Sequence, residues 1–187
     1  DAYPLLEAAI KELENVPQYQ KKQEEYKLTY GKIISNMGSY YYQRKEYEEA
    51  LKWHKKALEF RKISLPDRVM DSYRTIMSDY FCMKQYEKGY ETYREAVKKT
   101  QPDALFLVRA IGCELCLLKE KKEENLEKQI LEELPVQIER VVELAVSNRR
   151  MNVGVLKDLQ KKLEELEAWT ELQELVKEYR TKIEEYL

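Results

Sequence analysis

The side chains of this sequence that could bind a metal or transfer protons are one histidine and one close pair of cysteines. Cys113 and Cys116 have the Cys-x2-Cys spacing of many zinc and disulfide-exchange sites. They lie in the middle of a helical pattern, and no second Cys/His pair completes a tetrahedral zinc site, so we expect groove or core thiols and no bound metal. His54 occupies a position at which helices pack together, which favours a place in the core or at its boundary over catalysis.

The short motifs that bind nucleotides or activate nucleophiles do not occur in the sequence. There is no Gly-x-Gly-x2-Gly, no Gly-Lys-Ser/Thr and no Gly-x-Ser-x-Gly. Acid pairs such as Glu24-Glu25 and Glu164-Glu165 are typical of the solvated outer face of a helix. We therefore predict that this protein is not an enzyme and needs no cofactor.

The composition excludes several classes of partner. Lys and Arg number 33 and Asp and Glu number 35 in 187 residues, so the net charge of −2 provides no basic surface for nucleic acid. No apolar run approaches the roughly 20 residues that a membrane helix needs, and no signal peptide is present. Three cysteines, an odd number, and the lack of Asn-x-Ser/Thr sites indicate reduced thiols and a cytoplasmic protein.

The sequence begins at Asp1, within a helical pattern, and not at a methionine. We therefore expect a fragment of a longer protein. If the whole protein binds DNA, we expect the binding region before Asp1, because this segment is not expected to bind nucleic acid itself.

Helical periodicity runs through the whole chain, and the fold class is predicted to be all-α. The five prolines separate the helical patterns and are expected in first turns. They are Pro4, Pro17, Pro66, Pro102 and Pro135. The predicted helices, about ten, span 4–15, 18–44, 46–62, 66–84, 86–100, 103–119, 121–133, 135–149, 152–167 and 169–187.

Two passages repeat one pattern of large and small residues. The first reads Ile34-x2-Met37-Gly38-x2-Tyr41 and continues with Tyr47, Ala50, His54 and Ala57. The second reads Tyr73-x2-Ile76-Met77-x2-Tyr80 and continues with Tyr86, Gly89, Tyr93 and Ala96. Each marker of the second passage follows its counterpart by 39 residues. A repeat of this length indicates a stack of helical hairpins.

The first passage resembles the tetratricopeptide repeat, which reads Trp-x2-Leu-Gly-x2-Tyr and then Ala-x3-Phe-x2-Ala. The resemblance implies a right-handed superhelix of antiparallel helix pairs in one domain over 1–187. The repeats would cover 31–65, 66–100 and 101–134, followed by a divergent pair and a capping helix over 135–187. The length of the repeats is also similar to that of the repeat domain in peptide-sensing transcriptional regulators of Gram-positive bacteria.

The resemblance implies that the first helix of each pair lines a concave groove. Its groove residues would be Lys32, Ser35, Asn36, Ser39 and Tyr42 in the first repeat, Asp71, Arg74, Ser78 and Phe81 in the second, and Phe106, Arg109, Cys113 and Cys116 in the third. Arg74 and Arg109 occupy equivalent places and would stack along one wall, where guanidinium groups hold carboxylates or carbonyls. The alternative is that both pair with acids such as Asp71 or Asp79.

The family's two-carboxylate clamp, known from members that dock chaperone tails, is absent. Its positions are occupied here by Ser35, Ser39, Thr75, Phe106 and Ala110. The expected partner is therefore another peptide or protein segment, bound by the sensor or interaction part of a cytosolic bacterial regulator.

The last two predicted helices leave an alternative open. They carry a leucine-rich apolar stripe that either caps the stack or forms the seam of a homodimer. In the second case the protein would be a structural scaffold that oligomerises through its C-terminal helices.

Overall fold

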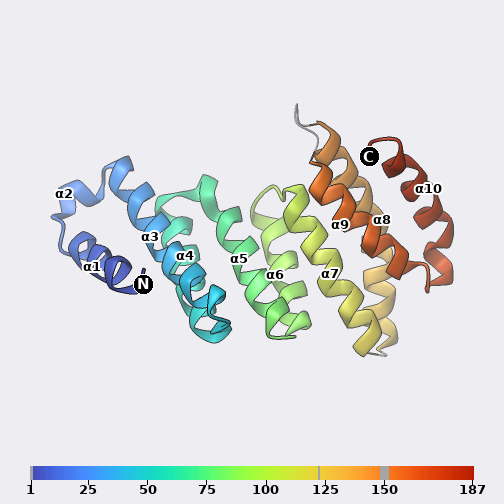
Figure 1. The fold of residues 1–187 in the computed structure, drawn as a ribbon, viewed down its shortest axis with the longest axis horizontal. Helices are drawn as coiled ribbons and strands as arrows, with labels where there is room; N and C mark the ends of the chain where they lie inside the picture. The colour runs from blue at the N-terminus through green and yellow to red at the C-terminus, as the bar shows by residue number, and fades with distance from the viewer. Residues whose placement is uncertain (1, 122, 148–151) are drawn as a thin grey trace. The chain divides into compact units, whose positions relative to one another are not determined.

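The computed structural model describes residues 2–121, 123–147 and 152–187, and every regular element in these ranges is helical. Ten α-helices and two 3-10 turns follow one another along the chain (Figure 1), which confirms the predicted all-α class. The structure divides into two compact units, 1–85 and 86–187. The boundary falls inside the predicted second repeat, 66–100, so the two helices of that repeat belong to different units.

Unit 1 is built from hairpins in which neighbours in sequence are neighbours in space. Its elements are α1 (Tyr3–Glu14), α2 (Gln18–Lys21), α3 (Glu24–Gln43), α4 (Tyr47–Ser64), η1 (Pro66–Arg68) and α5 (Val69–Cys82). α3 packs against α1 and α4, and α4 packs against α5. The predicted single helix over 18–44 is wrong, because Gln23 is extended between α2 and α3. This break allows the chain to turn so that α1 can pack against α3.

One apolar cluster of unit 1 joins α1, α3 and α4. Its buried members are Ile10, Tyr30, Ile34, Met37 and Ala57. These residues recur at helical spacing on their helices, so each helix presents one apolar stripe to the others. Ile34, Met37 and Ala57 of the repeat pattern are therefore core residues, while Tyr41 of the same pattern is half-buried against the cluster.

α3 and α4 pack tightly against each other at Gly38. A Cβ added there would lie 2.3 Å from Cδ2 and 2.5 Å from Nε2 of His54. His54 is 2 % exposed, which confirms the predicted place in the core. The imidazole ring fills the space that the missing side chain leaves, so Gly38 is small because His54 is large.

The turns that end α3 and α5 are the same structure, repeated 39 residues apart. Lys45 and Lys84 follow these helices with φ values of 64° and 56°. In both turns the next amide donates to the carbonyl five residues earlier, from Glu46 to Tyr41 at 3.0 Å and from Gln85 to Tyr80 at 2.9 Å. This left-handed cap normally uses glycine, so lysine is a strained choice at both positions.

Unit 2 also consists of helices packed against their sequence neighbours. Its elements are α6 (Tyr86–Lys99), α7 (Ala104–Glu120), α8 (Glu124–Ser147), α9 (Val153–Leu166), η2 (Thr170–Leu172) and α10 (Gln173–Glu184). α7 contacts α6, α8 and α9. The predicted end of a helix at 149 lies outside the described residues.

The predicted helix boundary at Pro135 is wrong, because Pro135 lies inside the single helix α8. An interior proline costs a helix about 3 kcal/mol. Ile130, Leu134 and Ile138 are fully buried on either side of it, and burying each such side chain contributes about 2 kcal/mol. Packing thus outweighs the local penalty. The other four prolines lie in first turns, in a helix cap or in the loop before a helix.

The apolar stripe of the C-terminal helices is buried within unit 2 itself. Leu156, Leu159, Leu163 and Leu166 of α9 have no exposed surface, and α10 packs on α9 and α8. A dimer seam would leave such a stripe open in the single chain, so the burial favours the capping alternative. No helix among the described residues is long and apolar enough to cross a membrane.

We predict that Gly38→Ala destabilises unit 1 by about 1–3 kcal/mol, because the new methyl group overlaps the His54 ring. Gly154→Ala is the matched control, since its Cβ meets nothing nearer than 3.7 Å. Urea unfolding followed by circular dichroism measures both. Equal stability of Gly38→Ala and the wild type would contradict the proposed contact.

We also predict that Lys45→Gly and Lys84→Gly each stabilise the protein by about 1 kcal/mol, because glycine adopts the left-handed conformation without strain. Lys52→Gly, at an exposed position inside α4, is the control and is expected to lower the stability by about 1 kcal/mol, because glycine disfavours a helix interior. Thermal unfolding measures whether the melting temperature rises for the two cap variants and falls for Lys52→Gly. A lower melting temperature for both cap variants would show that the two turns carry no strain.

Candidate functional site

The predicted groove residues of unit 1 form two accessible stripes, one on α3 and one on α5. Lys32, Asn36 and Phe81 are exposed. The remaining six are half-buried: Ser35, Ser39, Tyr42, Asp71, Arg74 and Ser78. Their spacing of three, four and seven residues keeps each set on one side of its helix.

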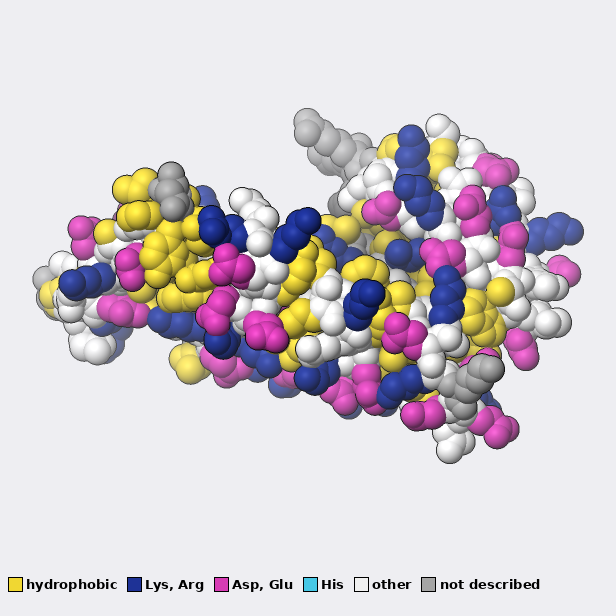
Figure 2. Space-filling model, turned by 60° about the horizontal axis from the view of Figure 1, so that its bottom comes forward, with side chains coloured by type: hydrophobic (Ala, Val, Ile, Leu, Met, Phe, Trp, Pro, Cys, Tyr) yellow, Lys and Arg dark blue, Asp and Glu magenta, His cyan; other side chains and the backbone are white. Residues whose placement is uncertain are grey.

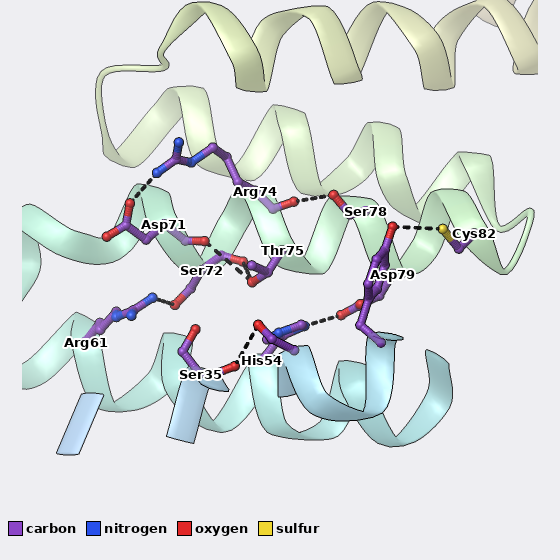
Figure 3. Close-up of polar contacts among 12 residues, drawn as sticks. Ser35, His54, Arg61, Asp71, Ser72, Arg74, Thr75, Ser78, Asp79 and Cys82 are labelled. Carbon is purple, nitrogen blue, oxygen red and sulfur yellow. Dashed lines mark hydrogen bonds and ion pairs between the residues drawn. The ribbon is translucent and has the colours of Figure 1, made fainter. Parts of the chain in front are cut away.

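Side-chain contacts tie α3 to α5 at both ends of these stripes (Figure 3). At one end the buried Arg61 of α4 donates from Nη1 to Oγ of Ser72 at 2.8 Å. It also donates from Nη2 to the carbonyl of Gly31 at 3.3 Å. At the other end the Tyr42 hydroxyl lies 3.2 Å from Sγ of Cys82. The two helices therefore run parallel and side by side. We call the surface formed by their two stripes the α3–α5 face.

The serines of the α3–α5 face use their hydroxyl protons on their own helices. Ser39 Oγ donates to the carbonyl of Ser35 at 3.2 Å, and Ser78 Oγ donates to the carbonyl of Arg74 at 3.0 Å. Both oxygens keep lone pairs for a further bond. The face consequently offers hydroxyl acceptors to the N–H groups of an extended peptide.

Arg74 is held by an acid on its own helix. Its guanidinium donates to Asp71, one turn earlier (Figure 3). The alternative in which Arg74 pairs with an acid is thus present in the structure, and the acid, Asp71, belongs to the same helix α5. Arg109 is half-buried on α7 in unit 2. The stacking of Arg74 and Arg109 along one wall stays a prediction, because they lie in different units.

Asp79 is bonded to histidine and not to an arginine. Its Oδ2 lies 2.6 Å from Nδ1 of His54, and both side chains are almost fully buried (Figure 3). Burial raises the pKa of the Asp79 carboxyl, and the bond from His54 opposes that rise. The pair joins α4 to α5 beneath the α3–α5 face, so it positions the face and is not accessible to a substrate.

Two of the groove residues suggested for the third repeat are wrong. Phe106 and Cys113 of α7 have no exposed surface, because α7 is covered by α6, α8 and α9. Burial raises the pKa of the Cys113 thiol to about 12, so it is not a thiolate at neutral pH. Cys116 is half-buried. Among the described residues, no three His, Cys, Asp or Glu side chains lie close enough to hold a metal ion.

Unit 2 contains a buried acid that the sequence analysis missed. Glu114 is fully buried on α7 and accepts a hydrogen bond from Nε2 of Gln137 on α8 at 2.7 Å. Burial raises its pKa to about 8. Its other oxygen and Gln137 Oε1 have no described partner, so a proton on Glu114 supplies the donor that the pair lacks. The available signal was an acid within the apolar run from Ile111 to Leu118.

The outer surface carries charges of both signs. On the view in Figure 2 basic and acidic side chains are interspersed, and no histidine shows because His54 is buried. Several of the ion pairs join residues three or four positions apart on one helix, such as Lys52 with Glu49, and others join different elements, such as Lys119 with Glu165. Exposed pairs of this kind contribute about 0–1 kcal/mol each, so they provide solvation and not the fold.

Helical hairpins packed in sequence order, with polar first-helix stripes, place the protein in the class of helical-repeat proteins. Residues 32–68 match the family model of the tetratricopeptide repeat. The segment comprising most of α3, all of α4 and η1 is thus a tetratricopeptide repeat, as its residues had suggested. Such repeats are in general protein-binding. A search of curated proteins gives no match to this chain.

We predict that Glu114→Gln removes a pH dependence of stability. The pKa of Glu114 is about 8 in the folded protein and 4.5 for an ordinary glutamate. Between these two pH values the folded state therefore holds one proton more than the unfolded state. The contribution of Glu114 to the free energy of unfolding is therefore greatest below about pH 4.5. Between about pH 4.5 and pH 8 it falls by at most about 1.4 kcal/mol per pH unit. Glutamine keeps the shape and stays neutral, so the variant should be more stable than the wild type at high pH.

Urea unfolding at about pH 5, 7 and 9 measures this difference. Glu120→Gln is the matched control, because it makes the same exchange at an exposed position at the end of α7. If Glu114→Gln and the wild type show the same slope with pH, Glu114 is ionised in the folded protein and the interpretation fails.

Proposed function

We propose that the protein binds an extended peptide or a segment of another protein on the α3–α5 face, and that it is a binding module and not an enzyme. The observation that carries the proposal is the pair of parallel polar stripes held in register at both ends by Arg61 and by Tyr42 with Cys82. A surface fixed in this way loses little entropy when it binds. The tetratricopeptide repeat at 32–68 contributes one of the stripes.

The chemistry of the face suits a peptide backbone with a few anchoring side chains. Ser39 and Ser78 present acceptors, Asn36 presents both donors and an acceptor, and Tyr42 and Phe81 present aromatic surface. Phe81 is 40 % exposed, so it adds accessible apolar surface at one end of the face.

The wider role that we propose is the sensor or interaction part of a bacterial regulator. Binding would act through the buried connection between α4 and α5, because a ligand that separates or closes α3 and α5 must also move the His54–Asp79 pair. The competing scaffold role draws no support from the C-terminal stripe, which is buried in the single chain.

The test is a selection of phage-displayed random dodecapeptides on the full chain, followed by titration of the synthesised binders. Ser39→Arg and Ser78→Arg each place a long charged side chain on the α3–α5 face. We expect each to weaken binding about tenfold or more, because a bulky group covers the backbone acceptors.

Thr170→Arg is the control, since it adds the same side chain at an exposed position of unit 2. Circular dichroism verifies that all three variants are folded. Binders whose affinity is equal for the wild type, Ser39→Arg and Ser78→Arg would place the binding surface elsewhere and refute the proposal.

A further inference from the structure

Arg61 is the only arginine of unit 1 that is buried among the described residues, and it has no carboxylate partner. It is 7 % exposed, and its two hydrogen bonds go to neutral oxygens of Gly31 and Ser72. Its Nε is buried without a hydrogen-bond partner. A buried cation normally faces an acid, because desolvation of an unpaired charge costs several kcal/mol, on the order given by ion-transfer estimates.

The charges around Arg61 do not neutralise it. Burial lowers its pKa, Asp71 partly opposes this, and Arg68 and Arg74 lower it further by repulsion. Asp71 is the single acid of the group, and it already accepts a bond from Arg74. Arg68 lies 3.9 Å from the other Asp71 oxygen, with 61 % of its side chain exposed. The preceding Asp67 makes no ion pair with either arginine in the described structure.

We infer that the end of the α3–α5 face around Arg61, Arg68 and Asp71 is a binding site for a carboxylate, supplied by an Asp or Glu side chain of the bound peptide. We call it the carboxylate site. The inference rests on the proposed function and names the chemistry of its ligand. Arg68 is accessible and can close a two-pronged bond on an incoming carboxylate, while the positive field of Arg61 acts from below.

The carboxylate site differs from the two-carboxylate clamp of tetratricopeptide repeats. The clamp uses the groove positions of first helices, which are occupied here by residues such as Ser35, Ser39 and Thr75. Arg61 is on the second helix of its hairpin, and Arg68 is in the connection to α5. The excess charge therefore comes from elements that the clamp does not use.

The geometry also sets the spacing of the ligand. Asp71 and Phe81 are ten residues apart on α5, which is about 15 Å along a helix. An extended peptide covers that length in about four or five residues. The peptide should therefore carry an acid and an apolar side chain at about this separation, one at the carboxylate site and the other on Phe81.

The experiment uses the dodecapeptide binders that Ser39→Arg or Ser78→Arg weakens. Each Asp and Glu in a binder is exchanged singly for Asn or Gln, and affinities are measured by calorimetry with the wild-type chain, Arg68→Gln and Asp71→Asn. We expect one acid to be required, with a loss of about tenfold when it is replaced. Arg68→Gln should lower the affinity for the acidic peptide by about the same factor. It should change the affinity for the peptide in which that acid is Asn or Gln only a little.

Asp71→Asn distinguishes binding from a structural role. Removing the internal acid takes one negative charge out of the carboxylate site and removes the ion-pair partner of Arg68, so affinity for the acidic peptide should rise about threefold. A purely structural Asp71 would lower it. Arg180→Gln in unit 2 is the control, because it also removes one guanidinium from an exposed ion pair.

Each outcome decides between the two proposals. Binders that need the α3–α5 face but tolerate loss of every acid and of Arg68 would refute the carboxylate site and leave the proposed function intact. A selection in which no binder is sensitive to Ser39→Arg or Ser78→Arg would refute both. A required acid coupled to Arg68 establishes the site.

Discussion

The contact of Gly38 with His54, continued by the bond from His54 to Asp79, is the constraint on which unit 1 depends. It brings α3, α4 and α5 together at one point, since each of the three residues comes from a different helix. An imidazole is short and polar where the family pattern has an aromatic hydrocarbon, so it can reach an acid on the next helix. The acid is buried and costs free energy unless it is bonded. This hydrogen bond therefore helps to fix the position of α5 on the first hairpin, together with the packing of α5 on α4.

Buried polar pairs set the relative positions of helices elsewhere in the protein as well. Arg61 links α4 to Gly31 of α3 and Ser72 of α5, and Glu114 links α7 to Gln137 of α8. Apolar stripes alone allow neighbouring helices to slide past one another, because dispersion contacts have little direction. A buried donor and acceptor prevent this sliding, because leaving either without a partner costs about 1–3 kcal/mol. These pairs therefore provide register, while the apolar core provides most of the stability.

The same register gives the α3–α5 face, the proposed binding surface, its shape. Its stripes are exposed because the opposite sides of α3 and α5 are occupied by α4, and they are parallel because Arg61 and the Tyr42–Cys82 contact fix both ends. The uncompensated charge of Arg61 lies at one end and the exposed Phe81 ring at the other. If the proposed binding takes place here, a charge at one end and an apolar ring at the other would select the direction as well as the composition of the ligand.

The sequence by itself determined the helical class, the first repeat and the sides of α3 and α5 that face outward, because these depend on a periodicity that local residues impose. It also placed His54 in the core. It failed at Pro135 and at Gln23, where the packing of distant residues outweighs a local preference, and at Phe106 and Cys113, where covering helices decide exposure. The partners of His54, Arg61 and Glu114 could come only from the tertiary structure, since no spacing rule connects residues 25, 30 or 23 positions apart.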